Sequence, residues 1–242
     1  MTALVSAELL KLRTTRTAFG FFAITVLLIL LLQGVTFATV DINTKRDVED
    51  AFGGAGIATI VLLILGIVAT TGEYRHRTIT GSLLATPDRR RYLASKLIAY
   101  VLTGAVLGAV AMAVTLVVGL PWLAVRDQPT ELFSTADFAF LVLRAIAATA
   151  ISGAIGVAIG AIVRNQVAAV VGILLYLFIV EPVIGLISDD VLKFTLGQSQ
   201  SSLLGGAFSE GLAPGYAALV YAGWALLLAA LGVALEQRRD VT

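Results

Sequence analysis

Residues 18–40 read AFGFFAITVLLILLLQGVTFATV, a run of 23 residues without a charged side chain. A helix needs about 20 consecutive apolar residues to cross the hydrocarbon core of a bilayer. This run meets that length. Because the bilayer core contains no water, backbone N–H and C=O groups there must hydrogen-bond to each other within a helix or a closed barrel. A barrel would show alternating segments of about ten residues instead. The run therefore predicts a membrane-spanning helix.

Five further stretches have the same character, and the composition of the whole chain agrees with them. Of its 242 residues, 58% are hydrophobic and 14% are charged, whereas a soluble domain carries about 25% charged residues. We expect the third span to end at Pro121, which has no backbone N–H. The fold class expected is an all-α polytopic membrane protein, one transmembrane domain over residues 1–242, with six spans at 18–40, 55–72, 97–120, 138–163, 167–187 and 215–235.

Composition also excludes several function classes. The chain has 17 Lys and Arg against 16 Asp and Glu, so it lacks the basic excess of a nucleic-acid-binding protein. It has no cysteine and a single histidine, His76, so we expect neither a metal site nor a catalytic residue. An intramembrane protease would need a histidine in the second span or two intramembrane acids at matching depth, and the sequence offers neither.

The distribution of positive charge predicts the orientation. Loops on the cytoplasmic side of a membrane carry an excess of Lys and Arg. With six spans, twelve of the 17 basic residues fall on the side of both termini, so we expect both termini in the cytoplasm, and the size suits a multi-pass protein of the bacterial cytoplasmic (inner) membrane. A signal peptide is the alternative for residues 18–40, although this run exceeds the usual 7–15 residues. The basic residues on this side are Lys11, Arg13, Arg16, Arg75, Arg77, Arg89, Arg90, Arg91, Lys96, Arg164, Arg238 and Arg239.

The connection between spans two and three is the only long cytoplasmic one, and residues 72–96 read GEYRHRTITGSLLATPDRRRYLASK. Thr86, Pro87 and Asp88 form a helix-start signal, so the third helix should begin about two turns before the membrane. The candidate interface residues around this start are Glu73, Arg75, His76, Arg77, Arg89, Arg90 and Arg91.

Residues 78–85 form a second candidate site within this connection. Ile79, Leu83 and Leu84 fall on one face of a short helix outside the membrane, and such a face needs something to bury against. One interpretation is an interfacial helix on lipid, with the arginines at anionic headgroups. The other is a docking helix for a cytoplasmic partner. The candidate residues of this helix are Thr78, Ile79, Gly81, Ser82, Leu83 and Leu84.

Two segments outside the spans also favour helices. Residues 1–16 predict an interfacial helix with an apolar stripe of Val5, Leu9 and Leu12, which Glu8 interrupts. Residues 188–214 form a long outer connection that mixes acids with apolar side chains. Two short helices that dip into the outer leaflet suit this mixture, and a disordered loop is the alternative.

Arg144 and Glu181 lie within the predicted fourth and fifth spans, each six residues from the outer end. Ionisable residues inside a membrane are costly and indicate a functional site by default. We expect this pair to face each other or a shared outer cavity, with Pro182 breaking the helix beside Glu181. A buried structural pair or snorkelling side chains are one interpretation, and a polar contact at an outer gate is the other.

Several motifs together resemble the permease subunit of type-2 ATP-binding-cassette (ABC) exporters. They are AELLKLRTTRT at 7–17, Glu73 with TITGSLL at 78–84, Pro87, Lys96, and GAIVRNQ at 160–166. The resemblance implies that residues 78–85 are a coupling helix seated in a groove of an ATPase subunit. It also implies re-entrant helices between spans five and six that help close the outer exit. Permeases of this kind pair largely through their first and fifth spans.

The resemblance implies the function as well. Two ATPase chains would assemble with this chain and with a second copy or a related permease, and would drive a lipophilic drug, peptide or lipid outward across the bilayer. The chain contains no G-x-x-x-x-G-K-[ST] motif, so ATP and Mg²⁺ are expected on the partner chains and no cofactor on this one. The alternative is an ion-coupled secondary transporter that uses Arg144 and Glu181.

Overall fold

The computed structural model of the chain describes residues 1–39, 44–53, 55–76, 78, 88–125, 134–205 and 211–238. Among these residues, every regular element is a helix, and six helical spans are long and apolar enough to cross a membrane. This confirms the all-α fold with six spans. The spans are α2 (Arg16–Thr39), α4 (Ala55–Arg75), α6 (Arg89–Val125), α7 (Thr135–Val163), the run of α8 (Gln166–Leu175), the π-helical turn η2 (Tyr176–Val180) and α9 (Glu181–Ile187), and α12 (Pro214–Arg238).

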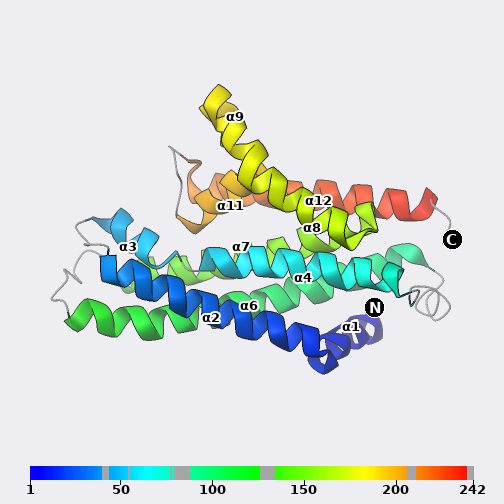
Figure 1. Cartoon of the computed structure of the whole chain (residues 1–242), viewed down its shortest axis with the longest axis horizontal. Coiled ribbons are helices and arrows are strands. Elements are labelled where there is room, and N and C mark those ends of the chain that lie inside the picture. Colours follow the sequence, from blue (N-terminus) through cyan, green and yellow to red (C-terminus); the bar gives the residue numbers. More distant parts are fainter. Residues whose placement is uncertain are drawn as a thin grey trace.

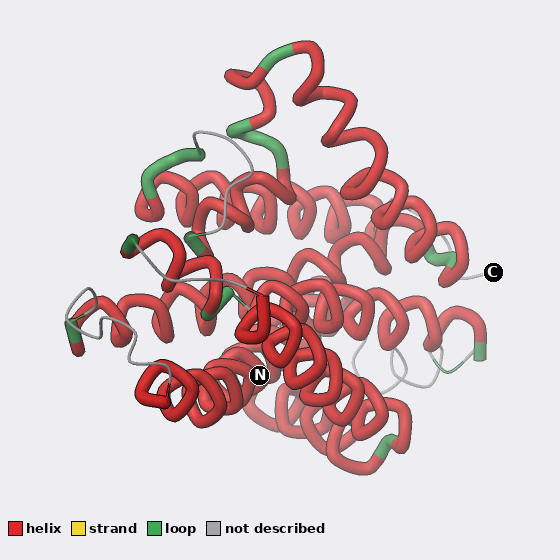
Figure 2. The backbone as a smooth tube through the Cα atoms, turned by 60° about the vertical axis from the view of Figure 1, so that its left-hand side comes forward, coloured by secondary structure: helices red, strands yellow, loops and turns green. Residues whose placement is uncertain are grey.

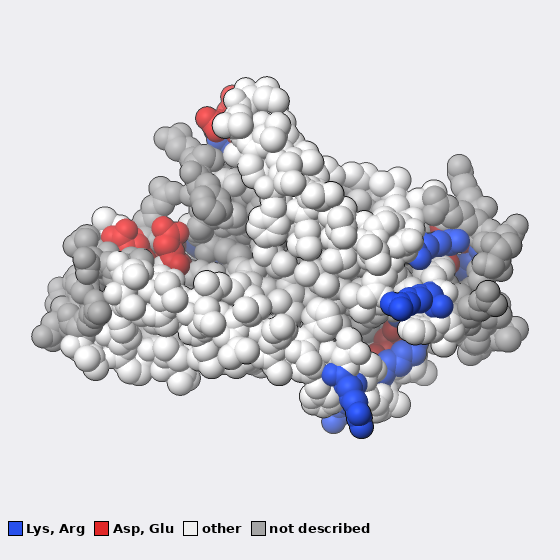
Figure 3. Space-filling view, in the orientation of Figure 1, with Lys and Arg blue, Asp and Glu red and all other residues white. Residues whose placement is uncertain are grey.

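Successive spans run in alternating directions, so the two ends of the bundle differ (Figure 1). One end carries α1 (Thr2–Thr14), the connection between α4 and α6, the α7–α8 turn and the end of α12. We call this the basic end, because most of the lysines and arginines visible in Figure 3 gather there, whereas most acidic side chains visible in that view lie toward the opposite end.

The centre of the bundle is the packing of α7 against α4 and α6. Small residues let these backbones approach closely, as they do at many interfaces between membrane helices. A methyl group at Gly104 of α6 would lie 2.5 Å from the Thr149 carbonyl oxygen of α7, and one at Gly156 of α7 would overlap the Leu63 carbonyl oxygen of α4. The glycines of spans three and four therefore serve packing within the chain.

An aromatic group closes the opposite end of the bundle. Phe37 stacks on Trp122 with ring centroids 4.7 Å apart and meets the edge of Phe52 at 5.7 Å. Phe52 follows the short helix α3 (Lys45–Ala51), which the hydropathy pattern does not predict. The Thr44 hydroxyl accepts the Asp47 N–H while the Asp47 carboxylate accepts the Thr44 N–H, and this capping box begins α3.

The third span differs from the prediction at its far end, whereas its helix begins about two turns before residue 97, as predicted. α6 continues through Pro121 to Val125, and membrane helices tolerate proline because neighbouring helices and local backbone adjustments satisfy the groups that it frees. The prediction that Pro121 ends this helix is wrong. At the other end, the Asp88 carboxylate accepts the N–H groups of Arg90 and Arg91, so Asp88 caps a helix that begins at Arg89. Thr86 and Pro87 lie outside the described residues.

The fifth span diverges from the bundle along its length. α8 begins beside the end of α7, but α9 stands away from the other helices in both views (Figures 1 and 2). The helix does not break at Pro182: the π-helical turn η2 comes directly before α9, and such a wider turn can accommodate a proline in a continuing helix. Large apolar side chains of this span are therefore exposed, among them Phe178 and Leu186.

Two short helices follow the fifth span, α10 (Asp189–Leu192) and α11 (Leu196–Leu204), as the sequence predicts for part of this connection. α11 packs against α12, α7 and α4. It buries polar side chains in the bundle: the Gln200 amide donates to the Thr59 hydroxyl at 2.6 Å, and Gln200 also accepts from the Tyr221 hydroxyl. α11 is therefore an integral part of the bundle.

Candidate functional site

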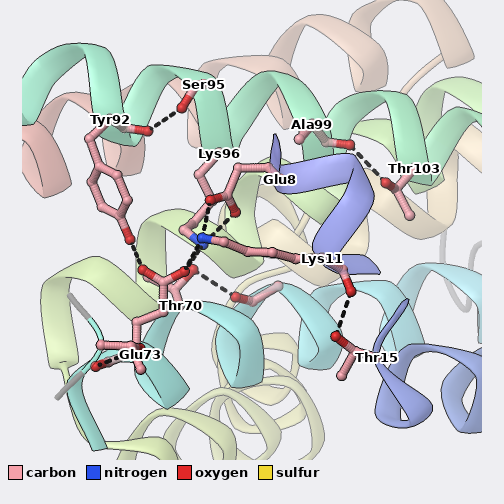
Figure 4. A network of polar contacts seen from close by, with 12 residues as sticks. Glu8, Lys11, Thr15, Thr70, Glu73, Tyr92, Ser95, Lys96, Ala99 and Thr103 are labelled. Carbon is pink, nitrogen blue, oxygen red and sulfur yellow. Dashed lines mark hydrogen bonds and ion pairs between the residues drawn. The ribbon is translucent and has the colours of Figure 1, made fainter. Parts of the chain in front are cut away.

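Four charged side chains meet at the basic end, and we call them the four-charge cluster: Glu8, Lys11, Glu73 and Lys96 (Figure 4). They come from α1, the end of α4 and the start of α6. The Lys96 ammonium lies 2.7 Å from Glu8 Oε2 and 2.9 Å from Glu73 Oε1. The Lys11 ammonium lies 2.6 Å from Glu8 Oε1 and 3.0 Å from the same Glu73 oxygen. The cluster thus joins three separate helices.

Every carboxylate oxygen in the cluster has a donor. Glu8 accepts from Lys11 on one oxygen and from Lys96 on the other. Glu73 accepts from both lysines on Oε1, and the Tyr92 hydroxyl donates to Oε2. Lys96 is only 1% exposed, and a buried ion without a partner costs several kcal/mol. The pairing is therefore what allows these charges to lie inside the bundle.

Lys11 is the accessible member of the cluster, because its side chain is 48% exposed. Burial alone lowers the pKa of the Lys11 ammonium, but the hydrogen bond to Glu8 and the charges of Glu73 and Glu8 outweigh that effect and raise the pKa above its ordinary value. Lys11 therefore stays charged at neutral pH and presents a positive charge at the surface of the cluster.

One feature of the sequence pointed to this cluster: Glu8 interrupts the apolar stripe of α1. Glu8 falls among Val5, Leu9 and Leu12 on the apolar stripe of α1, and a carboxylate on a stripe that packs inward requires a buried cation. Glu8, Lys11, Glu73 and Lys96 each belong to motifs that carry the family resemblance, but their distances along the chain do not show that they meet.

A second cluster holds the end of α12, and we call it the Glu236 cluster. The Glu236 carboxylate accepts from the Tyr74 hydroxyl at 2.6 Å and from Arg164 at 2.9 Å. Arg89 donates to the backbone carbonyl of Glu236 at 2.7 Å, and Arg164 lies over the Tyr74 ring. Glu236 is 2% exposed, so this contact is also internal. It joins α4, α6, the α7–α8 turn and α12.

The backbone at Arg164 shows how the turn between spans four and five is built. Arg164 ends α7 with φ of 57°, a left-handed conformation that non-glycine residues seldom adopt. The next residue, Asn165, caps α8 by accepting the Ala168 N–H at 3.1 Å. The motif at 160–166 therefore combines a tight reversal with an arginine that reaches back to Glu236.

The two clusters lie at both ends of the connection between α4 and α6. Glu73 and Tyr74 are consecutive residues at the end of α4, while Arg89, Tyr92 and Lys96 lie in the first turns of α6. Of the predicted interface residues, Glu73 and Arg89 make these internal contacts, and the exposed ones are Arg75, His76, Arg90 and Arg91. Thr78 is exposed, and outside the described residues lie Arg77, Ile79, Gly81, Ser82, Leu83 and Leu84.

Arg144 and Glu181 do not form the predicted pair. Arg144 lies 3.2 Å from Glu49 of α3, and Glu181 accepts the Gly197 N–H at 2.7 Å, at the start of α11. The prediction that they face each other is wrong, because α9 diverges from α7 and because α3 brings a nearer acid to Arg144. Each residue instead connects a span to a helix at the end opposite the basic end.

The sequence model of the ABC-2 type transporter family matches residues 1–181, three-quarters of the chain. The match includes the four-charge cluster, both sides of the α4–α6 connection and the turn at Arg164. No curated protein matches the chain.

The described residues form a bundle with six spans that are long and apolar enough to cross a membrane. This fold is that of a multi-pass membrane protein. The chain belongs to the ABC-2 type transporter family, whose members supply the permease domain of type-2 ABC transporters. It is thus a permease subunit, a membrane transport component that is not itself catalytic.

Proposed function

We propose that this permease subunit belongs to an exporter driven by two separate ATPase chains, which bind ATP and Mg²⁺ and dock on residues 78–85. The observation that carries this proposal is the placement of the four-charge cluster and the Glu236 cluster at the two sides of that segment. A displacement of the segment would be passed to α1 through Glu8 and to α12 through Glu236. Its length and the apolar residues Ile79, Leu83 and Leu84 suit a coupling helix that buries one face in an ATPase groove.

In this proposal the basic end faces the cytoplasm of a bacterial cell, and both termini lie on that side. Exposed arginines support this orientation, among them Arg13, Arg16, Arg75 and Arg90, because positive charge is enriched on the cytoplasmic side. The same arginines suit contact with anionic headgroups of the inner leaflet, with α1 lying along the interface.

A second permease, either another copy or a related chain, is proposed to pack on the first and fifth spans. These are among the spans with the most exposed apolar surface, including Phe19, Leu27 and Leu31 on α2 and Phe178 on η2. A path between two such subunits would suit a lipophilic drug, a peptide or a lipid moving outward. α10 and α11 would close the outer end of that path, and Glu181 joins α11 to the fifth span.

An ion-coupled secondary transporter has less support. That mechanism would use Arg144 and Glu181 in one site, whereas each has a separate partner in the fold. Glu181 accepts the Gly197 N–H at the start of α11, so its carboxylate already has a partner within the fold.

The test is purification of the full chain in mild detergent with identification of the proteins that accompany it in stoichiometric amounts. We expect an ATPase chain with a phosphate-binding loop to accompany the native protein and to be lost when Ile79, Leu83 and Leu84 are changed to Asp. The control is Val191→Asp in α10, an exposed position at the opposite end of the bundle, which should retain the ATPase. A preparation of the folded native protein that contains no ATPase would contradict the proposal.

A further inference from the structure

A cavity of about 510 Å³ lies beside the four-charge cluster, between α1, the start of α2, the second half of α4 and the first turns of α6. This volume is within the usual range for a small-molecule site. Its lining includes apolar side chains, among them Leu12, Leu65 and Val68, together with all four members of the four-charge cluster. The cavity therefore has the two-part character that an amphiphile requires.

Tyr100 provides a further hydrogen-bond donor in the lining of the cavity. It lines the cavity, is 2% exposed as a residue, and makes no side-chain hydrogen bond to the described part of the chain. Among the described residues, this hydroxyl is not one of the fully buried side-chain atoms that lack a partner, so it is accessible from the cavity, where a bound acceptor can take its hydrogen bond. Because Tyr100 lies one helical turn after Lys96, the hydroxyl belongs to the same face of α6 as the cluster.

The accessible charge in the lining of the cavity is positive. The oxygens of Glu8 and Glu73 already accept from Lys11, Lys96 and Tyr92, so neither acid has an oxygen without a donor. Lys11 is half-exposed and uses two of its three N–H groups on these acids. The site thus offers donors, from Lys11 and Tyr100, to a ligand that supplies acceptor oxygens.

We propose that this cavity binds an amphiphile with an anionic headgroup, whose phosphate or carboxylate oxygens accept from Lys11 and Tyr100 while its hydrocarbon chain lies along Leu65 and Val68. Charge-assisted hydrogen bonds of this kind are the strong ones, and the apolar side chains add binding energy as they lose contact with water. The ligand is either a phospholipid of the bilayer or a free amphiphile of the class that the permease transports. Binding does not depend on an ATPase, so it can be tested on this chain alone.

The experiment measures the binding of dodecyl phosphate to the full chain in dodecyl maltoside, as the rise in Tm with ligand concentration, and compares it with the neutral dodecyl glucoside. We expect dodecyl phosphate to bind the native protein, and Tyr100→Phe to raise its Kd about tenfold, since the variant loses a hydrogen bond to a charged group. Tyr100→Phe keeps the ring and should fold. Lys11→Met should raise the Kd further, and Tyr216→Phe, at an exposed tyrosine of α12, should leave it unchanged.

Native mass spectrometry of the protein purified without added lipid separates the two sources. A retained host phospholipid that dodecyl phosphate displaces identifies a bilayer lipid as the occupant, and binding of dodecyl phosphate without a retained lipid identifies a free amphiphile. Either result supports the site. Equal affinity for the phosphate and the glucoside, or an unchanged Kd in both Tyr100→Phe and Lys11→Met, overturns it.

Discussion

The Lys96 ammonium lies 2.7 Å from the Glu8 carboxylate, although 88 residues separate the two side chains in the sequence. This contact joins the N-terminal helix α1 to the first turns of α6, beside the connection on which the proposed ATPase would act. Both side chains are buried, so neither can be removed without leaving a charge of opposite sign inside the bundle. The pair is therefore a structural requirement for α1 to pack where it does.

Replacement of Lys96 by Met should destabilise the fold by about 3–5 kcal/mol, because Glu8 and Glu73 then lose a buried cation. The measurement is the free energy of unfolding in mixed detergent micelles. Arg91→Met is the matched control, since Arg91 and its partner Asp88 are both exposed, and it should change stability by about 0.5 kcal/mol or less. Adding Glu8→Gln to Lys96→Met should recover part of the loss. Equal effects of Lys96→Met and Arg91→Met would contradict the buried pair.

Sequence alone predicted the six spans because the bilayer imposes a length and an apolar character on each of them. It could not place the four-charge cluster, since nothing in the separation of Glu8, Glu73 and Lys96 indicates that three helices bring them together. The polar residue on the apolar stripe of α1 was the one local sign of a buried partner. The prediction singled out the connection between α4 and α6 but not the side chains that hold its two sides.

Arg164 in the turn between α7 and α8 combines an ion pair with a left-handed backbone, and two substitutions separate these effects. Arg164→Ala and Arg164→Gly both lose the contact with Glu236, but only glycine relieves the strain of a positive φ. We expect Arg164→Gly to be more stable than Arg164→Ala by about 1 kcal/mol. Unfolding of both variants in the same micelles measures the difference. An alanine variant as stable as the glycine variant would show that this turn is not left-handed.

The partner of Arg144 can be identified by exchanging charges. Arg144→Glu should destabilise the protein through repulsion with Glu49, and adding Glu49→Arg should restore stability, with a coupling energy of about 1 kcal/mol. Glu181→Arg should not rescue Arg144→Glu, since Glu181 contacts the start of α11. Rescue by Glu181→Arg and none by Glu49→Arg would favour the direct pair that the sequence suggested.

That suggestion failed for a reason that applies to other membrane proteins. Equal depth in adjacent spans predicts proximity only when the two helices remain side by side, and here α9 stands away from the bundle. The true partner of Arg144 lies on α3, a short helix in a connection whose structure depends on the Thr44–Asp47 capping box rather than on hydropathy. The sequence could predict the depth of Arg144 and Glu181 in the membrane, but it could not predict how far apart their helices lie within the membrane plane.

Gly156 and Gly172 lie in neighbouring spans and should respond to alanine in opposite directions. A methyl group at Gly156 would overlap the Leu63 carbonyl of α4, and the two backbones would have to separate, so Gly156→Ala should cost about 1–3 kcal/mol. A methyl group at Gly172 meets no atom within 4 Å, so Gly172→Ala should stabilise α8 by about 0.5–1 kcal/mol through the lower helix propensity of glycine. Both free energies come from the same unfolding measurement in micelles. A Gly156→Ala variant at least as stable as the native protein would show that α4 and α7 do not approach as closely as their glycines permit.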